Sequence, residues 1–408
     1  MRLTPRPVLL ALAAAAAILA CGADAARDFT PEVLALYRVC GGDSAPAEFE
    51  TKAGGEHRKE LDEAIRRWQD EFLAKARPWF ADLFESGYPA TVVYPFGGGD
   101  LLSLLAVYPD ASEYTTLSLE GMGDPRPVLD LELDEFRDAA EAGTALSKML
   151  ADVRGVLVEQ LERHWNTTIQ LSSESGKSGT GALPGVLAMT LVALEAHDCE
   201  PVSARFFTLS SDGTLHYLTQ ADVDAADRVG PPPPKSNEKV LQVGAFNDVE
   251  ITFRKRGDAR APLKTFRHIA ADLSDGALER DPSTLAHLEK KGQIAAMTKA
   301  ASYLLWFKGF TKIREYLLAH MTRMVSDDTG IPPRYAKAAG FTQEVWGRFE
   351  GAHFIDSHVY VQEEFKQLWA ASSKGELPFP FGYPDNAGNG HLLFTYKETQ
   401  SVARERSY

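Results

Sequence analysis

The fold is decided by residues 91–120, which read TVVYPFGGGDLLSLLAVYPDASEYTTLSLE. Residues 91–96 have the pattern of an apolar strand, and the three glycines at 97–99 predict a tight turn. Asp100 favours the start of a short apolar helix, because its carboxylate can accept the free amide hydrogens of the first turn. After a Pro-Asp turn, residues 114–119 predict a second strand. A strand–helix–strand crossover of this length gives parallel neighbours in a sheet covered by helices.

The remaining pattern predicts an α/β or α+β fold with mixed sheets, helical cover and two interdependent halves. We expect an N-terminal α/β half at residues 57–223, a proline-rich linker at residues 224–239 and a C-terminal α+β half at residues 240–408. The four consecutive prolines of the linker are stiff and cannot join the interior of a sheet. Because the C-terminal half offers few clear strands for its many apolar helical residues, we expect it to pack on the first half.

Hydrophobic periodicity and turn residues predict the other elements. We expect one long amphipathic helix at residues 57–85, kinked or broken near Pro78. Further helices are expected at residues 31–37, 134–164, 186–197, 283–291, 295–307 and 311–324, and strands at residues 128–133, 202–209, 215–219, 249–253, 263–273 and 391–396.

The N-terminus has the pattern of an export signal. Residues 1–20 carry a short basic region and then an apolar run that is too short to span a membrane. The run ends at Cys21 and resembles the bacterial lipobox, which implies a diacylated Cys21, a lipid-anchored tether over residues 21–56 and an outer-membrane address. The alternative is an ordinary signal peptide that is cleaved after Ala23 or Ala25.

Composition limits the classes of partner. The chain has 43 Lys and Arg residues against 57 Asp and Glu residues, and its formal net charge is −14. Nucleic-acid binding needs clustered basic residues, so we expect no nucleic-acid partner. Beyond Cys21, Cys40 and Cys199 either form a disulfide in an oxidising compartment or remain buried thiols. No Cys-x-x-Cys or zinc-ligand spacing is present, so we expect no metal site.

The glycine turn is the first candidate site. Backbone amides of Gly97, Gly98 and Gly99 at a helix N-terminus would make an anion or nucleotide cradle. Glu120 ends the next strand, where dinucleotide-binding folds place a ribose-binding acid. The order of elements also resembles the first half of class I methyltransferases. However, the glycines are consecutive, Pro95 lies in the leading strand, and an exported protein meets no cytoplasmic cofactor pool, so we expect no cofactor.

The second candidate site is the sequence Asp327-Asp328-Thr329-Gly330. Asp-Thr-Gly resembles the motif of aspartic proteases, in which two carboxylates share a proton. Here the motif occurs once and follows a predicted helix rather than an apolar strand. The alternative is the turn that ends a helix, with Gly330 in the left-handed conformation.

Several short motifs resemble a family of bacterial secreted proteins and lipoproteins with no assigned activity. They are Tyr94-Pro95-Phe96-x-Gly98-x-Asp100, Tyr108-Pro109-Asp110-Ala111, Leu119-Glu120, Ala301-Ser302-Tyr303-Leu304, Asp327-Asp328-Thr329-Gly330-Ile331-Pro332, Phe381-Gly382-Tyr383 and Leu392-Leu393. The resemblance covers about residues 90–396, and members usually have Ser at the position of Thr329. It implies one co-folded body and no catalytic residue.

These patterns lead to a main functional hypothesis and its alternatives. We expect a lipid-anchored envelope protein that binds or scaffolds at the outer membrane, with an envelope protein or glycan as partner. The first alternative is an envelope hydrolase or transferase that uses the carboxylates of Asp100, Glu120, Asp327 and Asp328. The second is a degenerate nucleotide-binding or methyltransferase-like fold. Convergence of the acids in one cleft would favour an enzyme, and dispersed or internally bonded acids would favour a scaffold.

Overall fold

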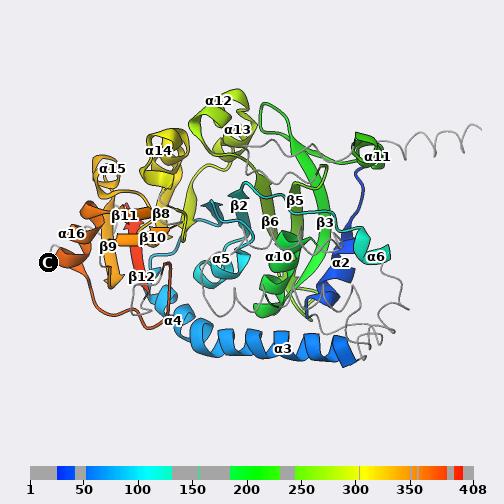
Figure 1. Ribbon diagram of the computed structural model, residues 1–408, viewed down its shortest axis with the longest axis horizontal. Coiled ribbons are helices and arrows are strands. Elements are labelled where there is room, and N and C mark those ends of the chain that lie inside the picture. The colour runs from blue at the N-terminus through cyan, green and yellow to red at the C-terminus, as the bar shows by residue number, and fades with distance from the viewer. Residues whose placement is uncertain are drawn as a thin grey trace, which may run out of the picture.

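A ten-stranded mixed sheet forms the centre of the molecule, as the computed structural model in Figure 1 shows. The structure describes residues 25–41, 52–130, 155, 184–229, 244–302, 304–349, 352–355, 358–383 and 390–397. The strand order is β4-β3-β5-β6-β2-β1-β7-β8-β12-β9. The strands are β1 (Thr91–Pro95), β2 (Glu113–Ser118), β3 (Cys199–Leu209), β4 (Leu215–Tyr217), β5 (Asp248–Lys255), β6 (Lys264–Ala270), β7 (Ile294–Thr298), β8 (Met321–Ser326), β9 (Thr342–Gly347) and β12 (His391–Tyr396). A separate antiparallel pair consists of β10 (Ala352–Ile355) and β11 (His358–Val361).

Five neighbouring strands of the sheet, β6-β2-β1-β7-β8, are parallel. Numbered among themselves along the chain, they have the order 3-2-1-4-5, which is the order of doubly wound nucleotide-binding folds. β12 is antiparallel to both of its neighbours, β8 and β9. On the other side, β5, β3 and β4 extend the sheet by antiparallel pairing. The structure therefore confirms the predicted α/β or α+β class with a mixed sheet and helical cover.

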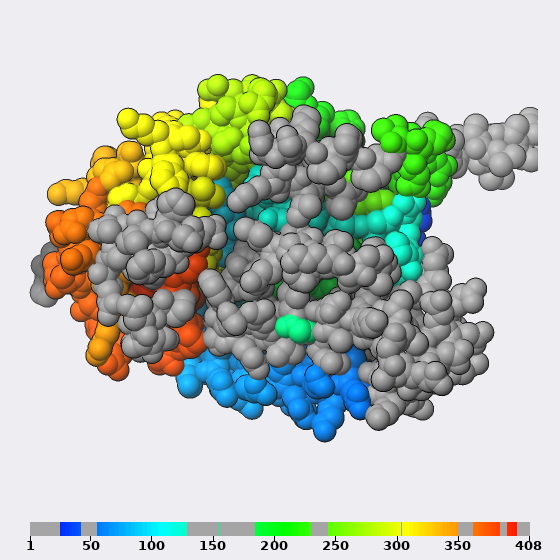
Figure 2. Space-filling view, in the orientation of Figure 1, coloured from blue at the N-terminus to red at the C-terminus, as the bar shows by residue number. Residues whose placement is uncertain are grey.

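Helices cover both faces of the sheet (Figure 1). One face packs on α2 (Thr30–Val39), α3 (Lys52–Trp68), α4 (Ala74–Leu83), α5 (Leu101–Val107) and α10 (Gly185–Ala196). The other packs on α12 (Asp275–Arg280), α13 (Ser283–Glu289), α14 (Thr311–His320) and α15 (Pro333–Ala338). α16 (Glu363–Ser372) packs near β9, and α6 (Pro127–Asp130) and α11 (Gln220–Val229) lie toward the β3 end. In the space-filling view, α3 and α4 form the lower edge and the C-terminal elements form the left end (Figure 2).

The β1–α5–β2 unit forms as the sequence predicts. β1 and β2 pair in parallel with Thr91 opposite Glu113, and every residue of α5 is buried. The Asp100 side chain caps α5 by accepting a hydrogen bond from the backbone N–H of Ser103 at 3.1 Å. Pro95 is the last residue of β1, where its missing N–H costs the sheet little.

The two halves of the chain share this one sheet. β5 and β6, which follow the predicted linker, lie between β3 and β2, which precede it. The tether predicted over residues 21–56 is wrong for α2, because Phe29, Val33 and Leu36 are fully buried in the core. An amphipathic ten-residue helix that buries this much apolar surface is stabilised by packing rather than left in solvent. The proline run itself and residues 42–51 lie outside the described residues.

Two predicted elements are wrong in type, and a third is correct over most of its length but extends too far. Residues 128–133 were expected to be a strand, but Pro127–Asp130 is helical. The helix predicted at 295–307 contains the strand β7, and the helix predicted at 311–324 ends at His320 and continues as the strand β8. Strands buried on both faces carry continuous apolar runs without alternation, so their pattern does not distinguish them from buried helices. The predicted helix at 134–164 lies outside the described residues.

The long N-terminal helix does not break at Pro78. It continues from α3 through a π-helical turn at Gln69–Leu73 into α4, which contains Pro78. The aromatic rings of Trp79 and Phe80 pack against Phe379, with centroids 5.5 and 5.4 Å away. Tertiary packing here outweighs the local penalty of an interior proline.

Candidate functional site

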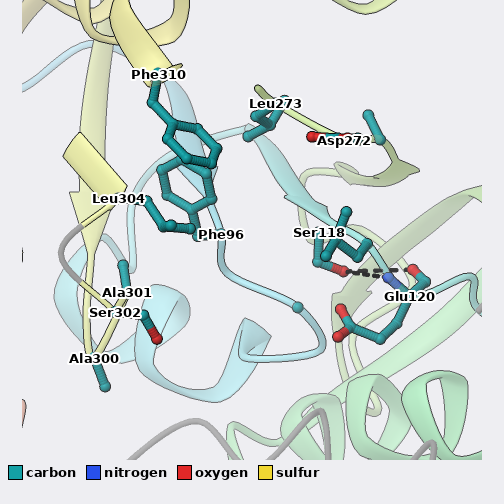
Figure 3. Close-up of a pocket in the computed structure, with 13 residues that line it drawn as sticks. Phe96, Ser118, Glu120, Asp272, Leu273, Ala300, Ala301, Ser302, Leu304 and Phe310 are labelled. Carbon is teal, nitrogen blue, oxygen red and sulfur yellow. Dashed lines mark hydrogen bonds between the residues drawn. The ribbon is translucent and has the colours of Figure 1, made fainter. Parts of the chain in front are cut away.

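The carboxyl ends of the parallel strands meet at one edge of the sheet, and a pocket opens there. From β1 the next parallel strands, β2 and β6, are added on one side, and the later strands β7 and β8 are added on the other side of β1. The direction of the strand order therefore reverses between β1 and β7. Ligands of open α/β sheets bind at such a switch point. We call this cavity of about 220 Å³ the switch-point pocket (Figure 3). It is lined by Phe96, Gly98, Ser118, Leu119, Glu120, Ala271, Asp272, Leu273, Ala300, Ala301, Ser302, Leu304 and Phe310.

Three lining residues of the pocket have a left-handed backbone. Phe96, Ala300 and Ser302 have φ values of 63°, 51° and 50°. Within the described residues, Asp198 is the one further non-glycine residue with positive φ. Such conformations are unfavourable for residues with a Cβ atom, and they persist where the surrounding structure holds them, often at functional sites. The clustering of three at one cavity therefore indicates a built site rather than an accidental gap.

One wall of the pocket is apolar and the opposite wall is acidic. The rings of Phe96 and Phe310 meet edge to face with centroids 5.7 Å apart. Figure 3 shows these two rings together with Leu304 on one side, and Ser118 and Glu120 across the cavity. An aromatic wall opposite a carboxylate suits a ligand that contains a ring and hydroxyl groups.

The end of β2 that carries Glu120 is fixed by His268. The fully buried imidazole of His268 lies with Nε2 2.8 Å from the Glu120 carbonyl oxygen and Nδ1 2.9 Å from the Thr116 hydroxyl. Because a carbonyl only accepts, Nε2 donates and Nδ1 accepts the hydroxyl hydrogen of Thr116. Burial lowers the pKa of His268 to about 4, which keeps the ring neutral. Sequence reasoning missed His268, because its partners come from another strand.

Asp100 lies at this edge but is not a lining residue of the pocket. Besides capping α5, it forms a buried ion pair with Lys299, with Oδ2 2.8 Å from Nζ. Tyr94 donates its hydroxyl hydrogen to the same carboxylate at 3.2 Å, and Lys299 also donates to the Ser103 hydroxyl. The Asp100 and Lys299 side chains are 0% and 2% exposed. Lys299 was missed because residues 295–307 were expected to be helical.

Asp327 is a fully buried acceptor that joins two loops. Its carboxylate accepts the backbone N–H groups of Ala300 at 2.8 Å, Thr329 at 2.9 Å and Tyr383 at 3.2 Å. The hydroxyl of Tyr383 donates to the Ala300 carbonyl at 3.1 Å. A Cβ at Gly382 would lie 2.3 Å from the Asp327 Cβ, so only glycine allows this approach. Asp327 therefore holds the wall of the pocket that contains Ala300.

Asp328 pairs with His391 instead of with Asp327. Asp328 Oδ1 lies 2.7 Å from His391 Nε2, and both side chains are 0% exposed. The expectation that a helix precedes this motif is wrong, because the buried strand β8 does. The two carboxylates nevertheless hold different loops, which does not fit a pair that shares a proton across a substrate cleft.

Of the four candidate acids, only Glu120 lines the switch-point pocket. Asp100, Asp327 and Asp328 are engaged in internal bonds, so the acids do not form one catalytic cleft. The motifs that carry the family resemblance do converge. Tyr94, Asp100 and Lys299 form one bonded group. The Tyr94 hydroxyl oxygen also lies 3.4 Å from the carbonyl oxygen of Lys299, the residue before Ala300 in the group around Asp327. These motifs therefore build the frame behind the pocket.

The glycine turn forms, but it does not make the expected anion cradle. The Gly97 N–H donates to the Leu117 carbonyl at 3.0 Å, and a Cβ at Gly97 would lie 2.6 Å from the Tyr94 ring. Gly98 lines the pocket, whereas Gly99 packs against α10 near Val186. The Asp100 carboxylate occupies the helix N-terminus where a ligand anion would bind.

The described residues also bear on the cysteines, on metal-binding groups and on membrane spans. Cys40 and Cys199 are free thiols. No group of three or more His, Cys, Asp and Glu side chains in the described ranges is placed to hold a metal ion. None of the described helices is both long and apolar enough to cross a membrane.

Comparison of the sequence with known proteins found no match, either among protein-family models or among curated proteins.

Proposed function

We propose that this chain is an exported, lipid-anchored envelope protein that binds a ring-containing, hydroxylated small molecule of nucleoside size in the switch-point pocket. The observation that supports it best is the pocket itself. A cavity at the reversal of strand order has three left-handed lining residues and a carboxylate at the end of β2. Structural packing alone does not require three unfavourable conformations around one cavity.

The lining chemistry gives the ligand class. Glu120 stands at the end of β2, where an acid can accept hydrogen bonds from vicinal hydroxyls of a ribose. The Phe96–Phe310 wall can contact an aromatic ring of the ligand either face to face or edge to face. The volume of about 220 Å³ lies below the typical range of about 300–1,000 Å³ for drug-sized ligands, which favours a single nucleoside or sugar over a dinucleotide. A glycan residue presents the same hydroxyl chemistry, so both sources belong in the test.

Calorimetric titration of the purified chain with adenosine and with free ribose tests this function. We expect adenosine to bind and Glu120→Gln to weaken its binding at least tenfold, because a charge-assisted hydrogen bond to a hydroxyl is lost. The matched control is Glu376→Gln, which removes a carboxylate that is 88% exposed. Binding of ribose alone, equal to that of adenosine, would point to a sugar site. If neither compound bound, or if the two variants behaved alike, the proposal would be wrong.

Lipid anchoring is supported by the apolar run that ends at Cys21. We expect labelled palmitate to appear in the membrane fraction of cells that express the full chain, and Cys21→Ser to abolish the label. Cys40→Ser serves as the control because Cys40 is buried in the folded part. A wild-type chain that is unlabelled and released from membranes would show an ordinary cleaved signal instead.

A methyltransferase-like transferase is the second candidate, and the strand order favours it. β12 is inserted antiparallel between β8 and β9, which extends the resemblance to class I methyltransferases beyond the first half of the sheet. This is an analogy of fold and does not establish activity. Titration with S-adenosylmethionine separates the two candidates: binding much tighter than that of adenosine would favour a transferase, and equal or weaker binding would favour a binding protein.

A further inference from the structure

The acidic lining of the switch-point pocket limits the charge of its ligand. Glu120 and Asp272 supply two carboxylates, and none of the described lining residues is Lys, Arg or His. The Asp272 carboxylate accepts the Ser274 N–H at 2.8 Å, which fixes its position. Like charges that face each other across an interface are strongly unfavourable, so this lining opposes an anionic ligand.

The helix N-terminus beside the pocket is already neutralised. Nucleotide-binding folds use the glycine turn and the first helix to bind phosphate. Here Asp100 Oδ1 accepts the Ser103 N–H at 3.1 Å, so the protein's own carboxylate takes the place of a phosphate oxygen. α5 is also only seven residues long, which limits its dipole.

The ammonium group of Lys299, which lies near the glycine turn, is not available to bind a ligand phosphate either. Lys299 immediately precedes the lining residue Ala300, but its ammonium group is 2.8 Å from Asp100 Oδ2 and 2% exposed. An ammonium group paired and buried in this way cannot compensate the charge of a ligand phosphate without breaking the pair. The glycine turn, the helix and the lysine therefore form a closed, neutral unit.

From these three observations we infer that the switch-point pocket selects unphosphorylated ligands that are neutral or cationic, and that Asp100 stands where a nucleotide-binding fold would hold phosphate. This inference rests on the proposed ring-binding function. It also separates this chain from nucleotide-binding proteins that have the same order of parallel strands.

Calorimetric titrations with adenosine and adenosine monophosphate at low and at high salt test the selectivity. At low salt we expect the monophosphate to bind at least tenfold more weakly than adenosine. The ratio of the two dissociation constants, monophosphate over adenosine, should decrease at high salt because charge repulsion is screened. Asp272→Asn should also reduce this ratio, because it removes one carboxylate charge from the lining. The Asn side chain keeps an acceptor for the Ser274 N–H, so the local structure is retained. Asp258→Asn is the matched control, because the exposed Asp258 accepts an N–H two residues on in the same way.

The outcomes separate this inference from the proposed function. If adenosine binds and the monophosphate binds equally well or more tightly, the charge selectivity is wrong while the ring site stands. The monophosphate could bind more weakly than adenosine at low salt by a factor that neither high salt nor Asp272→Asn reduces. Size rather than charge would then exclude the phosphate, and the role given to the carboxylates would be wrong. If neither compound binds, the proposed function and this inference both fail.

Discussion

Lys299→Met should lower the free energy of unfolding by about 3–5 kcal/mol, as measured by urea denaturation. The ammonium group of Lys299 is the partner of Asp100 inside the core, with 2.8 Å between Nζ and Oδ2. Removing it leaves a buried carboxylate charge that still accepts hydrogen bonds from the Tyr94 hydroxyl and the Ser103 N–H. An unpaired buried charge costs far more than the pair itself contributes.

The double variant Asp100→Asn/Lys299→Met identifies the cause. Asn still caps α5, and no buried charge remains, so we expect the double variant to recover most of the lost stability. The exposed pair of Lys290 and Asp212, 3.8 Å apart, provides the control. Lys290→Met should cost less than about 1 kcal/mol. A similarly small loss for Lys299→Met, or no recovery in the double variant, would mean that the ion pair does not hold this edge of the sheet.

Acidification should destabilise the protein as the pH falls from about 6.5 to 4, the interval between the unfolded and folded pKa values of His268. In that range His268 binds a proton in the unfolded chain but stays neutral in the folded protein, so unfolding becomes more favourable as the pH falls. This shift corresponds to about 3 kcal/mol. Burial lowers the pKa of His197 to about 3, which acts in the same direction.

His268→Gln isolates this contribution, because its amide can donate to the Glu120 carbonyl but does not titrate. Comparison with wild type is needed because another buried group acts in the opposite direction. Burial raises the pKa of Asp248 to about 7, so protonation of Asp248 stabilises the folded protein as the pH falls. We expect urea denaturation curves at pH 7 and pH 4.5 to differ less for His268→Gln than for wild type. Equal pH dependence in the two proteins would show that His268 is not held neutral in the fold.

Local patterns in the sequence predicted the β1–α5–β2 unit well. The Asp100 cap joins residues only three positions apart, so spacing and residue type suffice to predict it. Lys299, the ion-pair partner of the same carboxylate, and the partners of His268 lie far away along the chain: Thr116 and His268 are 152 positions apart. Pairs of this kind depend on the strand order, which the sequence did not reveal.

The errors at β7 and β8 had the largest consequence for the site. Ile294–Thr298 is buried throughout and lacks the alternation that marks a half-exposed strand. Assigning this region to helices placed Lys299 and Ala300 away from the sheet edge, and it also removed the strand that leads into Asp327. As a result, the carboxylates of Asp100, Asp327 and Asp328 were counted as candidate catalytic groups, whereas their bonds are internal.

The central claim, that the switch-point pocket binds a ligand, is tested most directly by amide hydrogen exchange with and without adenosine. Binding should slow exchange at the four segments after the strands around the pocket, residues 96–98, 118–120, 271–273 and 300–302. The same protection should be lost in Glu120→Gln and kept in Glu376→Gln. Protection confined to other elements, or no protection at these four segments at an adenosine concentration that saturates the calorimetric signal, would contradict the account.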